Sequence, residues 1–104
     1  MSDDYLRVVR EGMRQTVTNG SGRAMSSLPV EVAAKTGTAQ FDVEKLKTHS
    51  WFTAFAPYGN PEIALSVIVE GGGEGYSVAE PVAKNIIEKY FNLPLTPIVA
   101  AKTE

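Results

Sequence analysis

The chain has 104 residues, with 12 acidic side chains against 10 lysines and arginines and a formal net charge of −2. These are the length and composition of one ordinary globular domain, and the mildly acidic balance excludes the basic surface typical of nucleic-acid-binding proteins. There is no cysteine and one histidine, His49, which excludes disulfides, thiol nucleophiles and Cys/His zinc sites. No apolar run approaches the roughly 20 residues that span a bilayer, and the acidic N-terminus lacks the pattern of a signal peptide.

The first predicted element is an amphipathic helix over residues 4–18. Its apolar side chains recur at spacings of three and four and therefore share one face: Leu6, Val9, Met13 and Val17. Ser2 or Asp3 can cap the start of this helix. Asn19-Gly20 is expected to end it in a left-handed conformation, and a loop follows up to Pro29.

Three extended segments come next, over residues 30–41, 49–56 and 63–69. Because their connections are short, including a charged one over residues 42–48, they are predicted to pair antiparallel as a meander with helices packed on the sheet. In the second segment, Trp51 and Phe55 share one face and Phe52 lies on the other, and all three are interpreted as core residues. The third alternates bulky with smaller side chains and is expected to be covered on both faces.

A second amphipathic helix is predicted over residues 78–91. Ser77 and Glu80 have capping-box spacing, whereas Pro81 suits the first helical turn. The helix is therefore expected to begin at Ala79 or Glu80.

The fold class predicted from these elements is α+β, a three-stranded antiparallel meander flanked by an N-terminal and a C-terminal helix. Residues 1–92 are expected to form the domain. Residues 93–104, which contain Pro94 and Pro97, are expected to form a loosely ordered tail.

The segment Lys35–Gln40 carries the most informative chemistry, with a cation, two hydroxyls and a glycine on one extended stretch. Strand alternation places Thr36 and Thr38 on the same face, and Gly37 allows another backbone to approach closely. Hydroxyls beside a cation suit a carboxylate, and an edge strand can pair with an extended peptide. These residues predict an edge strand that binds a peptide or its terminal carboxylate.

Four sequence blocks in order resemble one family. Lys-Thr-Gly-Thr-Ala-Gln is followed by the blocks His49–Pro57 and Pro61–Glu70, then by a glycine loop and Ala79-Glu80-Pro81. Together they resemble the C-terminal part of the transpeptidase domain of class B, monofunctional, elongation-type penicillin-binding proteins, which share the K-T-G motif with serine β-lactamases. The resemblance covers about residues 8–91. It implies a fragment of the penicillin-binding transpeptidase fold and a role in cross-linking peptidoglycan by acyl transfer from a D-Ala-D-Ala stem peptide.

The resemblance implies roles for matching positions. Lys35 is expected to act catalytically by bonding toward a serine of an S-x-N motif, and the backbone N–H of Thr38 to be one oxyanion-hole donor. Substrate binding is assigned to Thr36, Gly37, Thr38, Ala39 and Gln40, with the two threonines holding the substrate carboxylate. No metal or organic cofactor is implied. β-Lactams are the implied covalent inhibitors.

The sequence departs from the family pattern at the nucleophile. None of the serines has lysine three residues later or asparagine two residues later: Ser2, Ser21, Ser26, Ser27, Ser50, Ser66 and Ser77. With S-x-x-K and S-x-N both missing, the isolated chain is predicted to be inactive, as one wall of an active site. By resemblance, the complete protein is expected to act on the extracytoplasmic face of the bacterial cytoplasmic membrane, anchored by a segment outside this chain.

Other interpretations of the same residues stay open. The strand edge could serve a noncatalytic peptide-binding module, and a β-lactamase or sensor domain shares K-T-G, although the Trp51–Pro57 block argues against that reading. His49 is interpreted as a solvated or hydrogen-bonded strand-end residue, and Glu70, Glu74 and Glu80 as solvated acids. In the family, the strand over residues 63–69 is flanked by a further strand absent here, so the isolated chain is expected to self-associate through that edge.

Overall fold

The structure is a computed structural model that describes residues 2–42, 47–71 and 78–98, without the side chains of residues 39–42 and 47. Its elements in chain order are the helix α1 (Asp3–Asn19), the 3-10 helix η1 (Arg23–Ser27), the strands β1 (Ala33–Asp42), β2 (Lys47–Ala56) and β3 (Ile63–Val69), and the helix α2 (Glu80–Tyr90). The expected α+β class and helix–meander–helix order are confirmed. The predicted connection over 42–48 was too long, because β1 and β2 extend into it from both sides.

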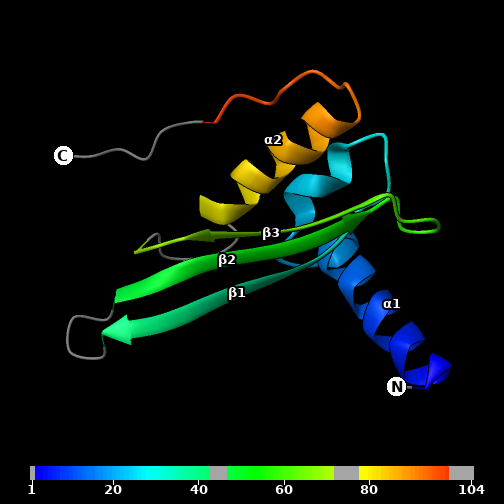
Figure 1. Cartoon of the computed structure of the whole chain (residues 1–104), viewed down its shortest axis with the longest axis horizontal. Coiled ribbons are helices and arrows are strands. Elements are labelled where there is room, and N and C mark those ends of the chain that lie inside the picture. The colour runs from blue at the N-terminus through cyan, green and yellow to red at the C-terminus, as the bar shows by residue number, and fades with distance from the viewer. Residues whose placement is uncertain (1, 43–46, 72–77, 99–104) are drawn as a thin grey trace.

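The three strands form one antiparallel sheet in the order β1-β2-β3, so β2 is central (Figure 1). The register pairs Thr36 with Phe52 and Phe52 with Val67 across the sheet. Residues paired in this way share a face, and their neighbours along each strand point to the other. Of the three positions, Phe52 is fully buried, so this face is the inner one.

The inner face is covered by α2 and η1 (Figure 1). Its core consists of small and medium apolar side chains around one aromatic ring: Val17, Met25, Val32, Ala34, Phe52, Ala54, Ala56, Ala79, Ala83 and Ile87. Burial of this kind contributes roughly 25 cal/mol per Å² of apolar surface removed from water. Phe52 is the largest of the fully buried side chains in this core.

The outer face of the sheet is covered only at one end, where α1 packs. There the Arg10 guanidinium lies 5.4 Å from the ring centre of Phe55 and 5.7 Å from that of Tyr58, and it donates to the Tyr58 carbonyl at 2.8 Å. Farther along, Trp51 is 39% exposed and Ile68 is 45% exposed. The expectation that Trp51 belongs to the core was therefore wrong, as was the expectation that both faces of β3 are covered, because no described element extends over that end.

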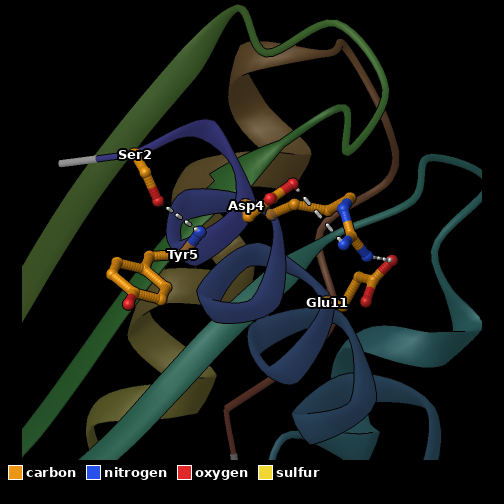
Figure 2. Close-up of polar contacts among 5 residues, drawn as sticks. Ser2, Asp4, Tyr5 and Glu11 are labelled. Carbon is orange, nitrogen blue, oxygen red and sulfur yellow. Dashed lines mark hydrogen bonds and ion pairs between the residues drawn. The ribbon is translucent and has the colours of Figure 1, made fainter.

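The helix α1 begins as the sequence predicts, with the Tyr5 N–H donating to the Ser2 hydroxyl at 3.3 Å (Figure 2). Arg7 lies between Asp4 and Glu11 on the exposed surface, at N–O distances of 3.9 and 3.5 Å. Figure 1 shows that this half of α1 extends away from the sheet. The predicted apolar face is buried only toward the C-terminal end of the helix.

The burial of the apolar face of α1 and the conformation of its C-terminal cap differ from expectation. Val17 is buried, whereas Leu6 and Val9 are about half exposed. Gly20, expected in a left-handed conformation, has φ −121° and is extended. Its N–H still caps the helix by donating to the Thr16 carbonyl at 3.1 Å, so the helix ends there without a left-handed residue.

The helix α2 begins at Glu80 with Pro81 in its first turn, one of the two starts predicted. Ser77, the other half of the expected capping box, lies outside the described residues. Within the described part of the tail, Thr96 is anchored to Glu88 through its N–H and its hydroxyl at 2.9 and 2.6 Å. Among the described residues, no helix combines the length and apolarity needed to cross a membrane.

Candidate functional site

The Lys-Thr-Gly-Thr segment lies in the middle of β1, an edge strand of the sheet. Thr36 and Thr38 pair with Phe52 and Ser50 and lie on the inner face. Lys35 points to the outer face, is exposed, and donates from its ammonium group to the Thr36 carbonyl. The cation and the hydroxyls that the sequence places together are therefore on opposite sides of the strand.

Gly37 lies between the two threonines and opposite Trp51 in the register. A Cβ built on Gly37 would lie 3.4 Å from the Trp51 Cβ, so a side chain at this position would contact Trp51. The backbone of Ala39 and Gln40 continues β1 opposite His49 and Thr48, while their side chains lie outside the described part of the structure. Residues 36–40 therefore form one continuous stretch of strand backbone.

Ser21 contacts the site, although the sequence placed it only in the loop that follows the first helix. Its hydroxyl lies 2.7 Å from the Thr36 hydroxyl. Gly20 and Gly22 flank Ser21. A Cβ on either glycine would lie 3.1 to 3.2 Å from atoms of Thr16, which is closer than most contacts that Cβ atoms make in proteins. The Gly-Ser-Gly turn thus packs against the end of α1 in a way that larger side chains would disturb. This close packing directs Ser21 toward β1, and the Gly-Ser-Gly pattern was the signal in the sequence.

Glu80 is not solvated, contrary to expectation. Its side chain is 1% exposed because α2 packs its first turn against η1. Burial raises the pKa of Glu80 to about 7, against smaller lowering effects from the Ala24 and Met25 backbone N–H groups and the Lys84 ammonium. Its Oε2 atom has no hydrogen-bond partner among the described residues. A carboxyl of this kind exchanges its proton near neutral pH.

Two further contacts connect β2 to its surroundings. The Ala79 N–H donates to the Ser50 hydroxyl at 3.1 Å, which joins the residue before α2 to the centre of the sheet. His49 accepts a hydrogen bond at Nδ1 from the Gly71 N–H at 2.9 Å. The interpretation of His49 as a hydrogen-bonded strand-end residue is confirmed, and the ring joins Gly71, two residues after the end of β3, to β2.

An open pocket of about 480 Å³ lies between the end of α1 and the start of α2. Its walls come from the turn after α1, from η1 and from α2: Asn19, Gly20, Ser21, Arg23, Ala24 and Glu80. Ser21 therefore lines this pocket and contacts Thr36, and Glu80 lines the same pocket.

The family model for the penicillin binding protein transpeptidase domain matches residues 1–88. The chain is a member of the penicillin-binding protein transpeptidase family. Among its relatives, the peptidoglycan D,D-transpeptidase MrdA of Haemophilus influenzae is 38% identical over 105 residues. That match covers 86% of this chain and 16% of the relative, so the chain spans about one sixth of the protein it matches.

Solved structures place the same fold in related enzymes. Pseudomonas aeruginosa PBP2 in complex with WCK 5153 is 38% identical with a TM-score of 0.70, over 79% of this chain and 18% of that one. Penicillin-binding protein A of Mycobacterium tuberculosis, an imipenem acyl-enzyme complex, is 28% identical with a TM-score of 0.71, over 88% and 20%. The resemblance to class B, elongation-type penicillin-binding proteins and the fragment of the transpeptidase fold are confirmed.

Proposed function

We propose that this chain supplies the K-T-G wall of the active site of a peptidoglycan D,D-transpeptidase. The observation that carries the proposal is the placement of Thr36 and Thr38 on one face of an edge strand, inside a chain of this family. Within the described residues, β1 pairs on one side only, so its other edge offers backbone groups to an extended peptide. The substrate class proposed is a D-Ala-D-Ala stem peptide.

Each residue has a distinct role in this proposal. The Thr36 and Thr38 hydroxyls hold the terminal carboxylate, and the Thr38 N–H stabilises the negative charge that develops on the attacked carbonyl oxygen. Lys35 bonds toward the serine of an S-x-N motif outside this chain and polarises the surroundings of the nucleophile. Gly37, Ala39 and Gln40 provide the strand backbone along which the peptide lies.

The reaction is acyl transfer through a serine ester. A serine oxygen attacks the carbonyl carbon of the penultimate D-Ala, the peptide bond to the terminal D-Ala breaks, and that amine leaves with a proton. The amine of a second stem peptide then takes the acyl group and releases the serine. The sequence contains no S-x-x-K serine, so the nucleophile comes from residues outside this chain. The site of action proposed is the extracytoplasmic face of the cytoplasmic membrane.

β-Lactams are the proposed covalent inhibitors of the complete enzyme. The relative from Mycobacterium tuberculosis forms an imipenem acyl-enzyme, and this chain shares its fold with a TM-score of 0.71. A β-lactam carries a carboxylate and a reactive amide carbonyl, the two features that the threonines and the Thr38 N–H are proposed to bind.

The test is acylation of a complete transpeptidase that carries these 104 residues. Thr38→Val removes one hydrogen bond to a charged group, and Lys35→Ala removes the cation. Such bonds contribute roughly 1.5–3 kcal/mol, so each variant is expected to lower the second-order rate of acylation by penicillin at least about tenfold.

Thr18→Val, an exposed substitution on α1, is the matched control and should leave the rate unchanged. Unchanged rates in both site variants, with retained folding, would refute the site assignment. They would favour the noncatalytic peptide-binding module that uses the same strand edge.

A further inference from the structure

The hydroxyl of Thr36 has its partner outside the sheet. The Ser21 hydroxyl, 15 residues earlier in the chain, lies 2.7 Å from it, which is the usual length of an O–H···O hydrogen bond. Thr36 is half-buried in the middle of β1, whereas Ser21 is exposed in the turn between α1 and η1. Within the described part of the chain, the Thr36 hydroxyl has no other hydrogen-bond partner.

The backbone around Ser21 is held by hydrogen bonds on both sides. The N–H groups of Gly20 and Gly22 both donate to the Thr16 carbonyl, at 3.1 and 2.9 Å. The Arg23 N–H donates to the Gly20 carbonyl at 3.3 Å, and Gly22 is buried. The turn is therefore closed onto the last turn of α1, and the Ser21 hydroxyl loses little conformational freedom when it contacts β1.

The helix before this turn is itself joined to the start of β1. Arg14 donates to the Val32 carbonyl, one residue before the strand, at 2.7 Å, and its guanidinium lies 3.7 Å from the Glu31 carboxylate. Val17, in the last turn of α1, is fully buried in the same core cluster as Val32. The position of Ser21 relative to β1 is therefore set by buried packing and by bonds to the backbone, and does not depend on the exposed hydroxyl contact.

We propose that Ser21 is a positioning residue that orients the Thr36 hydroxyl toward the carboxylate of the bound ligand. This inference rests on the proposed function, in which Thr36 holds that carboxylate. A hydroxyl has one proton to donate and lone pairs that accept, whereas a carboxylate only accepts. When Ser21 donates to the Thr36 oxygen, the Thr36 proton is directed away from Ser21 and toward the carboxylate. The two bonds form a chain and polarise each other, which strengthens the bond to the carboxylate.

The test is the second-order rate of acylation by penicillin in a complete transpeptidase that carries these 104 residues. Ser21→Ala removes the donor and is expected to lower this rate by roughly threefold to tenfold, whereas Ser21→Thr keeps a hydroxyl and should retain the rate. Ser26→Ala is the matched control, because the exposed Ser26 hydroxyl donates to the Arg23 carbonyl of its own helix at 2.6 Å. It should leave the rate unchanged.

Two comparisons separate positioning from general structural support. Penicillin methyl ester lacks the free carboxylate, so Ser21→Ala should leave the rate of acylation by the ester unchanged. In a Thr36→Val background, Ser21→Ala should cause no further loss with penicillin, because Ser21 acts through the Thr36 hydroxyl. Equal losses with penicillin and with its ester, or a full further loss in the Thr36→Val background, would overturn the inference.

Failure of this inference can be told apart from failure of the proposed function. Thr36→Val removes a hydrogen bond to a charged group and should lower the rate with penicillin at least about tenfold. If it does so while Ser21→Ala leaves the rate unchanged, Ser21 has no positioning role and the site assignment stands. If Thr36→Val and Thr38→Val both leave the rate unchanged, the K-T-G wall is refuted, and this inference with it.

Discussion

Glu80 and Glu88 lie about two turns apart on α2 and are both buried, yet only Glu88 has a hydrogen-bond donor at each carboxyl oxygen. Burial raises the pKa of Glu88, but bonds from the Thr96 N–H and hydroxyl and from the Asn85 amide outweigh it, so the pKa lies below its ordinary value. For Glu80, burial outweighs the bonds and the pKa rises to about 7. The same helix therefore carries two acids whose titration changes the free energy of unfolding in opposite directions as pH rises.

Glu80→Gln should change how the stability of the chain depends on pH. Because the folded pKa of about 7 exceeds the ordinary 4.5, Glu80 stabilises the fold fully below pH 4.5 and this contribution is lost as pH rises through 7. The variant should be more stable than the native chain at pH 8, by on the order of 1–3 kcal/mol, and lose this advantage at pH 5. Urea unfolding at both pH values measures the difference. An equal difference at the two pH values would contradict the prediction.

Thr96→Val should have the opposite pH dependence. It removes the hydroxyl that donates to Glu88 Oε2 at 2.6 Å, which is expected to lower the free energy of unfolding at pH 7 by roughly 1.5–3 kcal/mol. Because the folded pKa of Glu88 is depressed, the loss should shrink as pH falls below 4.5 and the carboxyl gains a proton. Thermal unfolding at several pH values measures this loss of stability, with Thr18→Val, at an exposed threonine, as the control. A loss of unfolding free energy that does not change with pH would contradict the prediction and would indicate that Thr96→Val acts by disturbing side-chain packing.

The isolated chain should form no covalent adduct with penicillin. Nucleophilic catalysis requires an activated hydroxyl, and no serine in the sequence has lysine three residues later. Intact mass spectrometry after incubation with a fluorescent penicillin measures adduct formation, with a complete penicillin-binding protein as the positive control. A stoichiometric adduct on any serine of the chain would disprove the prediction.

The chain should self-associate through β3. This strand is an edge of the sheet, contains no proline, and has Ile68 45% exposed on the outer face. Sedimentation at several concentrations is expected to show a dimer or a larger assembly, with slow amide exchange across residues 63–69. Ile68→Lys should shift the chain toward monomer, whereas Glu62→Lys, outside the strand, should not. A monomer at high micromolar concentration with fast exchange along β3 would show that this edge stays unpaired.

The local pattern of the sequence was sufficient to predict the two α-helices, the three strands and the strand pairing, whereas η1 lies in a segment predicted to be a loop. Alternation and spacing identified the three strands and two helices, because burial of one face imposes those periods on the residues themselves. The placement of Thr36 with Thr38 followed from the same alternation, as did the separation of Phe52 from Trp51.

What the sequence did not reveal depends on contacts between distant residues. The burial of Glu80 arises because η1, more than fifty residues earlier, packs against the first turn of α2, and no local pattern marks it. The Ser21–Thr36 contact likewise requires the turn after α1 to fold back on β1. Trp51 looked like a core residue because large aromatic side chains usually are buried, yet no described element covers its end of the outer face.

Lys35 and Thr36 are neighbours in sequence but lie on opposite faces of an edge strand. A bound molecule that reaches both side chains must pass around the edge, and it cannot lie flat on either face. The backbone from Lys35 to Thr38 then lies between the two ends of the bound molecule. It contacts that molecule whichever side chains the strand carries. A substitution on one face can therefore weaken one end of the bound molecule while the contacts at the edge and on the other face persist.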